Sequence, residues 1–223
     1  EAMATLLREV NIWFGFSHPH VIRLFGACHV GRPFFVCEYA TNGTLVSYLR
    51  KHPNELWFKM LEAALGVQYL HARGVVHGEL QGNNIVIGSN KKAKVTDFGL
   101  SSFVDDDCHS EISAASHWVA PEALVNEDSR LTFASDIYSL GMRIVEALRV
   151  VGPGEDSFRG CLPWGALDNI AVKNHVRRGK LPFQPWNCTD EQWQLVRRMC
   201  AFESKERIKV ATVVDSLARL ANS

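Results

Sequence analysis

Three short motifs follow one another at set distances along the chain, and this order limits the possible folds more than any other feature. H-G-E-L-Q-G-N-N occupies 77–84, D-F-G occupies 97–99 after a β-rich run, and A-P-E occupies 120–122. Asn84 lies 13 residues before Asp97, and Ala120 lies 21 residues after Gly99. One tripeptide alone carries little weight, but three motifs in this order and at these spacings are a specific signal.

Hydrophobic spacing predicts helices and strands in a mixed order, which makes the fold class α+β. Apolar residues recur at helical spacing over 6–14, and the apolar runs 21–28 and 33–39 predict a strand pair around Gly31. An apolar stripe that starts at Trp57 predicts a long helix, which Gly74 closes. Short strands are predicted at 75–76, 85–87 and 94–96, a polar loop at 101–116, and helices near 133–150, 166–178, 190–201 and 208–221.

Charge and cysteine content argue against several classes of function. Basic and acidic residues both number 24, so no net charge draws the surface to nucleic acid or anionic lipid. No apolar run approaches the ~20 residues that span a bilayer, and no leader sequence is visible. The six cysteines form no C-x-x-C pair, which argues against a disulfide framework or a zinc ribbon. We therefore expect a cytoplasmic segment without nucleic-acid or membrane contact, cut at its amino end inside a helix.

In this order the motifs resemble the catalytic core of eukaryotic protein kinases, whose signatures are H-R-D-L-x-x-x-N, D-F-G and A-P-E. Gly43 and Trp118 make the chain most similar to the tyrosine-kinase-like group of serine/threonine kinases. The resemblance implies a protein-kinase-like two-lobe fold with an incomplete small lobe and a mainly helical large lobe. Residues 1–40 would be the remnant of the small lobe, with the C-helix, two strands and the start of the hinge. Residues 41–223 would form the large lobe, with the catalytic loop, activation segment and helical subdomain.

The resemblance also implies which side chains serve phosphoryl transfer, a reaction that depends mainly on positioning and charge neutralisation. Asn84 and Asp97 would hold Mg²⁺ through hard oxygen atoms. Glu79 and Gln81 occupy two further catalytic positions of the loop. ATP would bind at the hinge, where the resemblance implies contacts from Cys37 at the gatekeeper position, Glu38, Ala40 and Val86.

A second group of residues is structural or regulatory by resemblance. Glu9 takes the place of the C-helix glutamate, and four residues take the places of the regulatory spine: Trp13, Leu24, His77 and Phe98. Glu122 is expected to form a buried ion pair with Arg207, and Asp136 to begin the buried helix that organises the large lobe.

Several positions depart from the kinase pattern. Glu79 replaces the aspartate that accepts the proton of the substrate hydroxyl, and its extra methylene moves the carboxylate by more than ~1 Å, which can cost about a hundredfold in rate. Gln81 replaces a lysine, Gly78 an arginine and Ala115 a threonine.

Neither a glycine-rich loop nor a strand lysine precedes Glu9. The similar strings at 152–154 and 170–173 follow A-P-E, where neither would contact nucleotide.

The leading interpretation is a kinase-like domain that transfers phosphoryl groups from ATP to serine or threonine of signalling proteins, with weak or no activity in this chain. The alternative is a catalytically inactive pseudokinase that acts as a scaffold or allosteric binding module. A protein substrate or a regulatory protein is the expected partner in either case. A small-molecule phosphotransferase is disfavoured, because the A-P-E segment, the long loop and Arg207 are typical of kinases with protein substrates.

Overall fold

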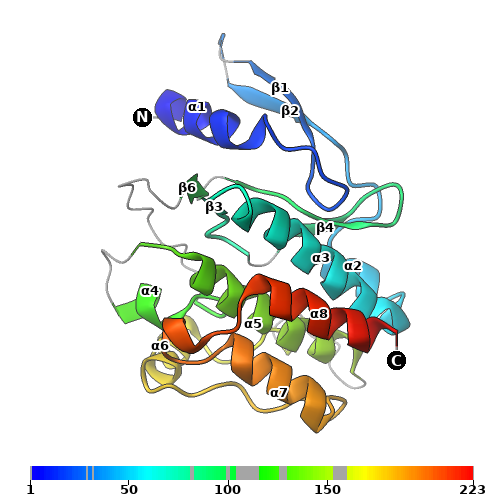
Figure 1. Ribbon diagram of the computed structural model, residues 1–223, viewed down its shortest axis with the longest axis vertical. Coiled ribbons are helices and arrows are strands. Elements are labelled where there is room, and N and C mark those ends of the chain that lie inside the picture. Colours follow the sequence, from blue (N-terminus) through cyan, green and yellow to red (C-terminus); the bar gives the residue numbers. More distant parts are fainter. Residues whose placement is uncertain are drawn as a thin grey trace.

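The computed structural model describes residues 2–28, 30–31, 33–80, 83–98, 101–103, 116–125, 130–152 and 160–222. Figure 1 shows two unequal parts: one helix with a pair of strands at the top, and a larger body made mainly of helices below. The elements follow the predicted order of helix, strand pair, long helix, short strands and further helices. The α+β class with a small mixed part and a helical larger part is confirmed.

The smaller part consists of α1 (Ala2–Trp13), β1 (Leu24–Cys28) and β2 (Phe34–Cys37). β1 and β2 pair antiparallel, and Gly31 between them has a φ of +78°, which glycine adopts without a steric penalty. The first strand is shorter than predicted, because Val21 forms a parallel bridge with Val95 in the larger part. The Ile22 amide also donates to the Val95 carbonyl at 2.9 Å. This short stretch therefore ties the two parts together.

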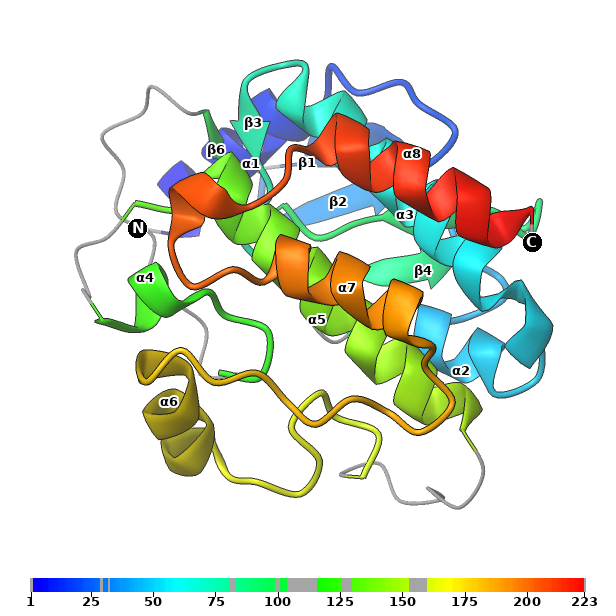
Figure 2. The same ribbon diagram turned by 60° about the horizontal axis from the view of Figure 1, so that its bottom comes forward.

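Two long helices form the centre of the larger part. α3 (Leu56–His71) packs on α8 (Val210–Ala221), and α5 (Phe133–Val151) packs on α3 and on α7 (Asp190–Met199). Figure 2 shows α8, α3, α5 and α7 running beside one another. A capping box between Thr132 and Ser135 begins α5. The shorter helical elements are α2 (Leu45–Leu49), η1 (Pro53–Glu55), α4 (Pro121–Val125), α6 (Asn169–Arg177) and η2 (Ser204–Glu206).

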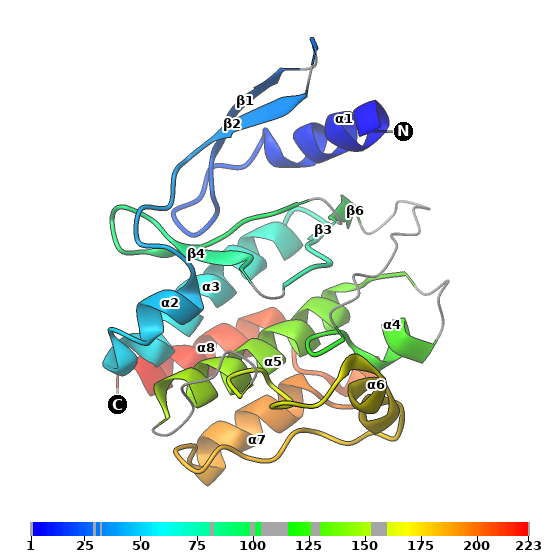
Figure 3. The same cartoon turned by 180° about the vertical axis from the view of Figure 1, so that it is seen from behind.

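Two small antiparallel sheets lie between the strand pair and the helices (Figure 3). β4 (Ile85–Ile87) pairs with β5 (Ala93–Val95), and β3 (Val75–Val76) pairs with β6 (Ser102–Phe103). β6 lies in the stretch 101–116, so the prediction of an uninterrupted loop there was wrong. Its two residues are too short to show the alternation that marks a strand in a sequence. Residues 104–115 lie outside the described ranges.

One hydrophobic cluster extends through both parts, from Trp13 and Leu24 in the smaller part to Leu217 in α8. The proposed domain boundary near residue 40 stays a prediction, because backbone hydrogen bonds of 21–22 also cross between the two parts. Across the described ranges, no helix has both the length and the apolar character needed to cross a lipid bilayer.

Candidate active site

Asp136, in the first turn of α5, holds the start of the 77–84 loop. Its carboxylate accepts hydrogen bonds from the backbone amides of His77 at 2.8 Å and Gly78 at 2.9 Å. The Nε2 atom of His71, at the end of α3, lies 2.9 Å from the same carboxylate. Asp136 is only 1% exposed, so these donors replace the water that its charge loses on burial. The first turn of α5 thus fixes the backbone that leads to Glu79.

His77 points back from the loop into the core. Its Nδ1 accepts from the Glu79 amide at 3.1 Å, and its Nε2 lies 3.0 Å from the Thr96 carbonyl. An accepting Nδ1 leaves the proton on Nε2, which can then donate to Thr96. Burial lowers the pKa of His77, and this effect outweighs the nearby charge of Asp136, so the ring is held neutral. The ring therefore links the loop to the strand that ends before Asp97.

Asn84 and Asp97, the two expected metal ligands, come from neighbouring strand ends. The Thr96 amide donates to the Asn84 carbonyl at 3.0 Å, and the Asn84 Nδ2 donates to the Glu79 carbonyl at 2.7 Å. Asn84 is therefore buried and oriented, while Asp97 is exposed and has a left-handed φ of +67°. Left-handed backbone is uncommon for a residue other than glycine and often occurs at functional sites.

The donor set of this corner fits Mg²⁺ in chemical type. A carboxylate and an amide oxygen are hard ligands, and Mg²⁺ commonly takes one or two protein ligands and fills its other positions with phosphate and water. The described residues contain no group of three His, Cys, Asp or Glu side chains that could hold a metal by themselves. Asn84 and Asp97 would thus need a phosphate ligand to complete the coordination of the ion.

The expected aromatic stack is present. The Phe98 ring lies 5.2 Å from the Trp13 ring and 5.4 Å from the His77 ring, centroid to centroid. Leu24 is buried in the same cluster. The Trp13 Nε1 donates to the Ile22 carbonyl at 2.6 Å, which also fixes α1 against the chain after it. The stack thus joins α1, the segment after β5 and the 77–84 loop.

Glu9 lies near this stack without a basic partner. Burial raises the pKa of its carboxyl, the charge of Asp97 raises it further, and a hydrogen bond from the Phe98 amide partly opposes both. In the described part of the chain, no lysine or arginine pairs with Glu9. The residue therefore contacts the D-F-G segment directly instead of bridging to a strand lysine.

The segment after β2 leaves suitable backbone groups for a ligand. The Glu38 amide donates to the Arg23 carbonyl, and the Ala40 carbonyl accepts from the Gly43 amide. Among the described residues, no hydrogen bond uses the Glu38 carbonyl or the Ala40 amide, the acceptor and donor that a purine edge could engage.

Cys37 is exposed at the end of β2, and Val86 is half-buried in β4 beside Thr44. The carboxylate of Glu38 pairs with Lys94 at 2.8 Å, which anchors the segment to β5.

The expected ion pair between Glu122 and Arg207 is confirmed. The Nη1 and Nη2 atoms of Arg207 donate to the two carboxylate oxygens of Glu122 at 2.7 and 2.6 Å. Arg207 also donates to the carbonyls of Ala134, Ala201 and Phe202. Its side chain has no exposed area, whereas that of Glu122 is 25% exposed. One arginine thus connects α4, the start of α5 and the segment before α8.

Sequence reasoning missed three residues that shape the site. His71 shares Asp136 with the loop, Lys94 holds the hinge-like segment through Glu38, and Phe16 packs its ring 5.4 Å from that of Phe98. Phe16 follows Trp13 by three residues, so helical spacing could have found it. His71 and Lys94 have partners 65 and 56 residues away, which only the fold brings together.

Some expected features fall outside the described ranges or away from the site. Gln81, Gly99 and Ala115 lie outside the described residues. Lys173, from the I-A-V-K string at 170–173, lies exposed on α6, as the sequence context predicted.

Comparisons with known proteins agree with this geometry. Residues 1–217 match the family described as protein tyrosine and serine/threonine kinase. Tyrosine-protein kinase Btk of Drosophila melanogaster is 28% identical over 97% of this chain, and tyrosine-protein kinase Fer of Rattus norvegicus is 27% identical over 99%. Ephrin type-A receptor 7 of Gallus gallus is 33% identical over 97%.

The matched region is a small share of each relative. It covers 28% of the Btk protein, 26% of the Fer protein and 22% of the ephrin receptor. The likeness therefore concerns about a quarter of the length of each relative. The family match extends over 217 of 223 residues, Asp136 holds the 77–84 loop, and His77 links that loop to the strand before Asp97; the chain therefore belongs to the protein tyrosine and serine/threonine kinase family.

Proposed function

We propose that this kinase domain acts in the ATP-dependent transfer of phosphoryl groups to protein hydroxyls, and that its transfer step is weak. The observation that carries the proposal is Glu79 on a braced loop. Its neighbours His77 and Gly78 are fixed by Asp136, and its own carbonyl accepts from Asn84. The loop backbone is therefore held in place, and what departs from the kinase pattern at Glu79 is the length of its side chain.

In the proposed mechanism Asn84 and Asp97 would hold Mg²⁺ at the phosphates of ATP, and the bound ion would supply charge neutralisation for the transfer. The free Glu38 carbonyl and Ala40 amide bind the adenine edge, with Cys37 and Val86 beside it. Glu79 accepts the proton of the attacking hydroxyl from a longer arm than aspartate has. A base displaced by more than ~1 Å lowers the rate without weakening nucleotide binding.

The proposal also includes which amino-acid hydroxyl receives the phosphoryl group. Gly43 and Trp118 suggest serine or threonine, whereas the relatives named above are described as tyrosine-protein kinases or an ephrin receptor. We keep serine or threonine as the acceptor to test first, against tyrosine as the competing one. A cytoplasmic setting is part of the same proposal, because Cys28, Cys37, Cys188 and Cys200 form no disulfide in the described part of the chain, which suits a reducing compartment.

A second candidate function is a pseudokinase that binds partner proteins and transfers nothing. The catalytic loop favours it, because Glu79 and Gln81 replace the aspartate and the lysine of the kinase pattern. Transfer would then lack a well-placed base and a cation near the transferring phosphate.

Nucleotide binding and transfer in the full-length protein separate the two candidates. MgATP binding is measured by calorimetry, and phosphate incorporation is followed in peptides that contain serine, threonine or tyrosine as the single hydroxyl. We expect MgATP binding, slow transfer to serine or threonine, and loss of both in Asp97→Asn. Asp215→Asn, an exposed change on α8, is the matched control and should alter neither.

The outcomes are distinct. MgATP binding without transfer to any peptide favours the pseudokinase, and transfer to tyrosine alone corrects the acceptor class. Absence of MgATP binding in the full-length protein contradicts the nucleotide site. For this chain alone we expect no thermal shift at about millimolar MgATP. A ligand stabilises a fold appreciably only when its concentration exceeds its Kd, and we expect the Kd of this chain for MgATP to lie above that range.

A further inference from the structure

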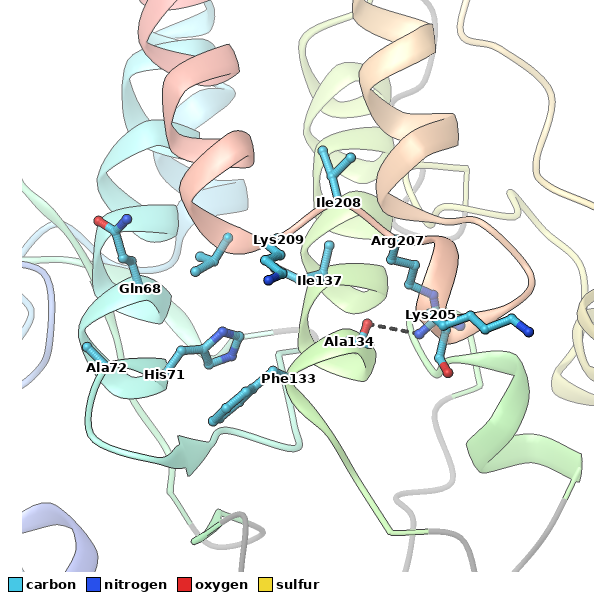
Figure 4. A pocket seen from close by; sticks show the side chains of 12 residues that line it. Gln68, His71, Ala72, Phe133, Ala134, Ile137, Lys205, Arg207, Ile208 and Lys209 are labelled. Atoms are coloured by element: carbon cyan, nitrogen blue, oxygen red, sulfur yellow. Dashed lines mark hydrogen bonds between the residues drawn. The ribbon is translucent and has the colours of Figure 1, made fainter.

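A pocket of about 560 Å³ opens on the larger part, on the far side of His71 from the 77–84 loop that Asp136 holds (Figure 4). It lies between the end of α3, the start of α5 and the segment that joins η2 to α8. Its volume falls within the roughly 300–1,000 Å³ that small-molecule sites occupy. Apolar walls come from Phe133, Ile137, Ile208 and Val210. The Phe133 ring lies 4.4 Å from the His71 ring, so one wall is aromatic.

The polar residues of the pocket give it a positive character. Its lining contains two lysines, one arginine and one histidine but no aspartate or glutamate. Arg207 is already bound to Glu122, and the Lys205 side chain extends away from the other lining residues in Figure 4. The Lys209 side chain turns toward the space between α3 and α5. No ion pair of Lys209 occurs within the described ranges, which leaves its ammonium available to a ligand.

We infer that this pocket binds a small aromatic carboxylate, with its ring against Phe133 and His71 and its carboxylate on the Lys209 ammonium. The ring would add to the existing aromatic pair, and the carboxylate would form a charge-assisted hydrogen bond at the rim. The pocket walls come from packed helices, so little has to be ordered on binding.

The pocket is connected to the catalytic loop through one residue. His71 lines the pocket, and its Nε2 lies 2.9 Å from the carboxylate of Asp136. That carboxylate accepts from the amides of His77 and Gly78. A ring packed on His71 therefore changes the surroundings of the group that holds the loop, and we expect the Gly78 amide to sense the ligand.

Amide NMR titration of the chain with naphthoate tests the site directly. We expect saturable shifts at Ala72, Phe133 and Lys209, together with a shift at Gly78. Lys209→Met keeps the apolar stem but removes the charge, and it should weaken naphthoate about tenfold, as loss of one hydrogen bond to a charged group does. Lys205→Met is the matched control and should leave the affinity unchanged. The neutral analogue naphthamide should bind weakly, and equally to the wild type and to Lys209→Met.

A second variant tests the position of the ring. Ala72 lies exposed at the end of α3 and lines the pocket, so Ala72→Leu should fill part of it and weaken naphthoate and naphthamide alike. Equal naphthoate affinity in the wild type, Lys209→Met and Ala72→Leu would overturn the proposal, as would shifts confined to 37–40. Binding without a Gly78 shift would contradict the link to the catalytic loop. Unchanged spectra up to about millimolar naphthoate would also contradict the site, since a Kd above about 1 mM corresponds to less than about 4 kcal/mol of binding free energy.

Discussion

Glu9 and Asp97 lie close enough together that the charge of Asp97 raises the pKa of Glu9. Burial is the larger cause of the raised pKa of Glu9, and the amide of Phe98 opposes it. An acid whose pKa is raised in the folded state prefers its protonated form there. Its contribution to stability is therefore present below its ordinary pKa and lost as the pH rises through the raised value.

The variant Glu9→Gln should remove this pH dependence. Glutamine resembles the protonated acid and can still accept from the Phe98 amide, so the variant should be more stable than the wild type near neutral pH. The difference should shrink as the pH falls from about 7 to about 4, where the wild type becomes protonated. Urea unfolding across this range measures it.

Glu191→Gln, at an exposed position of α7, removes the same charge and serves as the control. A stability difference between Glu9→Gln and the wild type that does not vary with pH would show that Glu9 keeps an ordinary pKa.

At the scale of single residues, the sequence could predict which residues belong to a motif, but not the partners that the fold brings to them. The stack of Trp13, Phe98 and His77 follows from recognised positions. The bond from His71 to Asp136 does not, because neither the spacing nor the composition of α3 distinguishes His71 from a surface histidine.

At the scale of elements, Arg207 joins two helices that are distant from it in sequence, α4 and α5, to the segment between α7 and η2. It bonds Glu122 in α4, Ala134 in α5, and the carbonyls of Ala201 and Phe202. Because the arginine is buried and Glu122 is partly exposed, the two residues should not be equivalent when removed. Loss of the arginine removes the cation beside the Glu122 carboxylate and a donor to three carbonyls, whereas loss of the acid leaves the arginine with its other acceptors.

Arg207→Met should therefore lower the free energy of unfolding by about 3–5 kcal/mol, the cost of breaking a buried pair. Glu122→Gln should lower it by about 1–3 kcal/mol, because an amide still accepts one hydrogen bond. Arg197→Met, at an exposed position of α7, should stay within about 0.5 kcal/mol of the wild type. Urea unfolding provides all three values. Equal losses in the first two variants would mean that the carbonyl contacts contribute nothing.

The accuracy of element prediction depended on length. The long helices α3, α5, α7 and α8 and the strand pair β1–β2 have enough residues to display a period, and the sequence predicted them. α2 and α4 have five residues each and β6 has two, so none completes enough turns or alternations to be recognised. The start of β1 was misplaced because Val21 and Ile22 are also buried, but their backbone pairs with β5 and not with β2.

For the whole molecule, the two parts differ in how well their apolar surfaces are covered. Phe25 and Phe34 on the strand pair are 58% and 53% exposed, and Phe14 at the end of α1 is 62% exposed. In α5, by contrast, Leu140 and Ile144 have no exposed area. A pair of strands with one helix is marginal unless it packs on further structure.

Hydrogen exchange of the chain should therefore show early opening of residues 1–40 and late exchange in α5. The smaller part can open without unfolding the larger one, because few buried apolar contacts hold it. The exposed faces should also favour association, so the measurement is made on the monomeric fraction. Equal protection of residues 1–40 and α5 in a monomer would contradict this account.

The central claim for the molecule is that it keeps the braced framework of a kinase while Glu79 and Gln81 weaken the transfer step. The direct measurement is phosphotransfer by the full-length protein, wild type against the double variant Glu79→Asp, Gln81→Lys. We expect kcat to rise at least about tenfold, which is ~1.4 kcal/mol of barrier, with MgATP affinity nearly unchanged. A wild type that is already fast, with a double variant no faster, would contradict the claim.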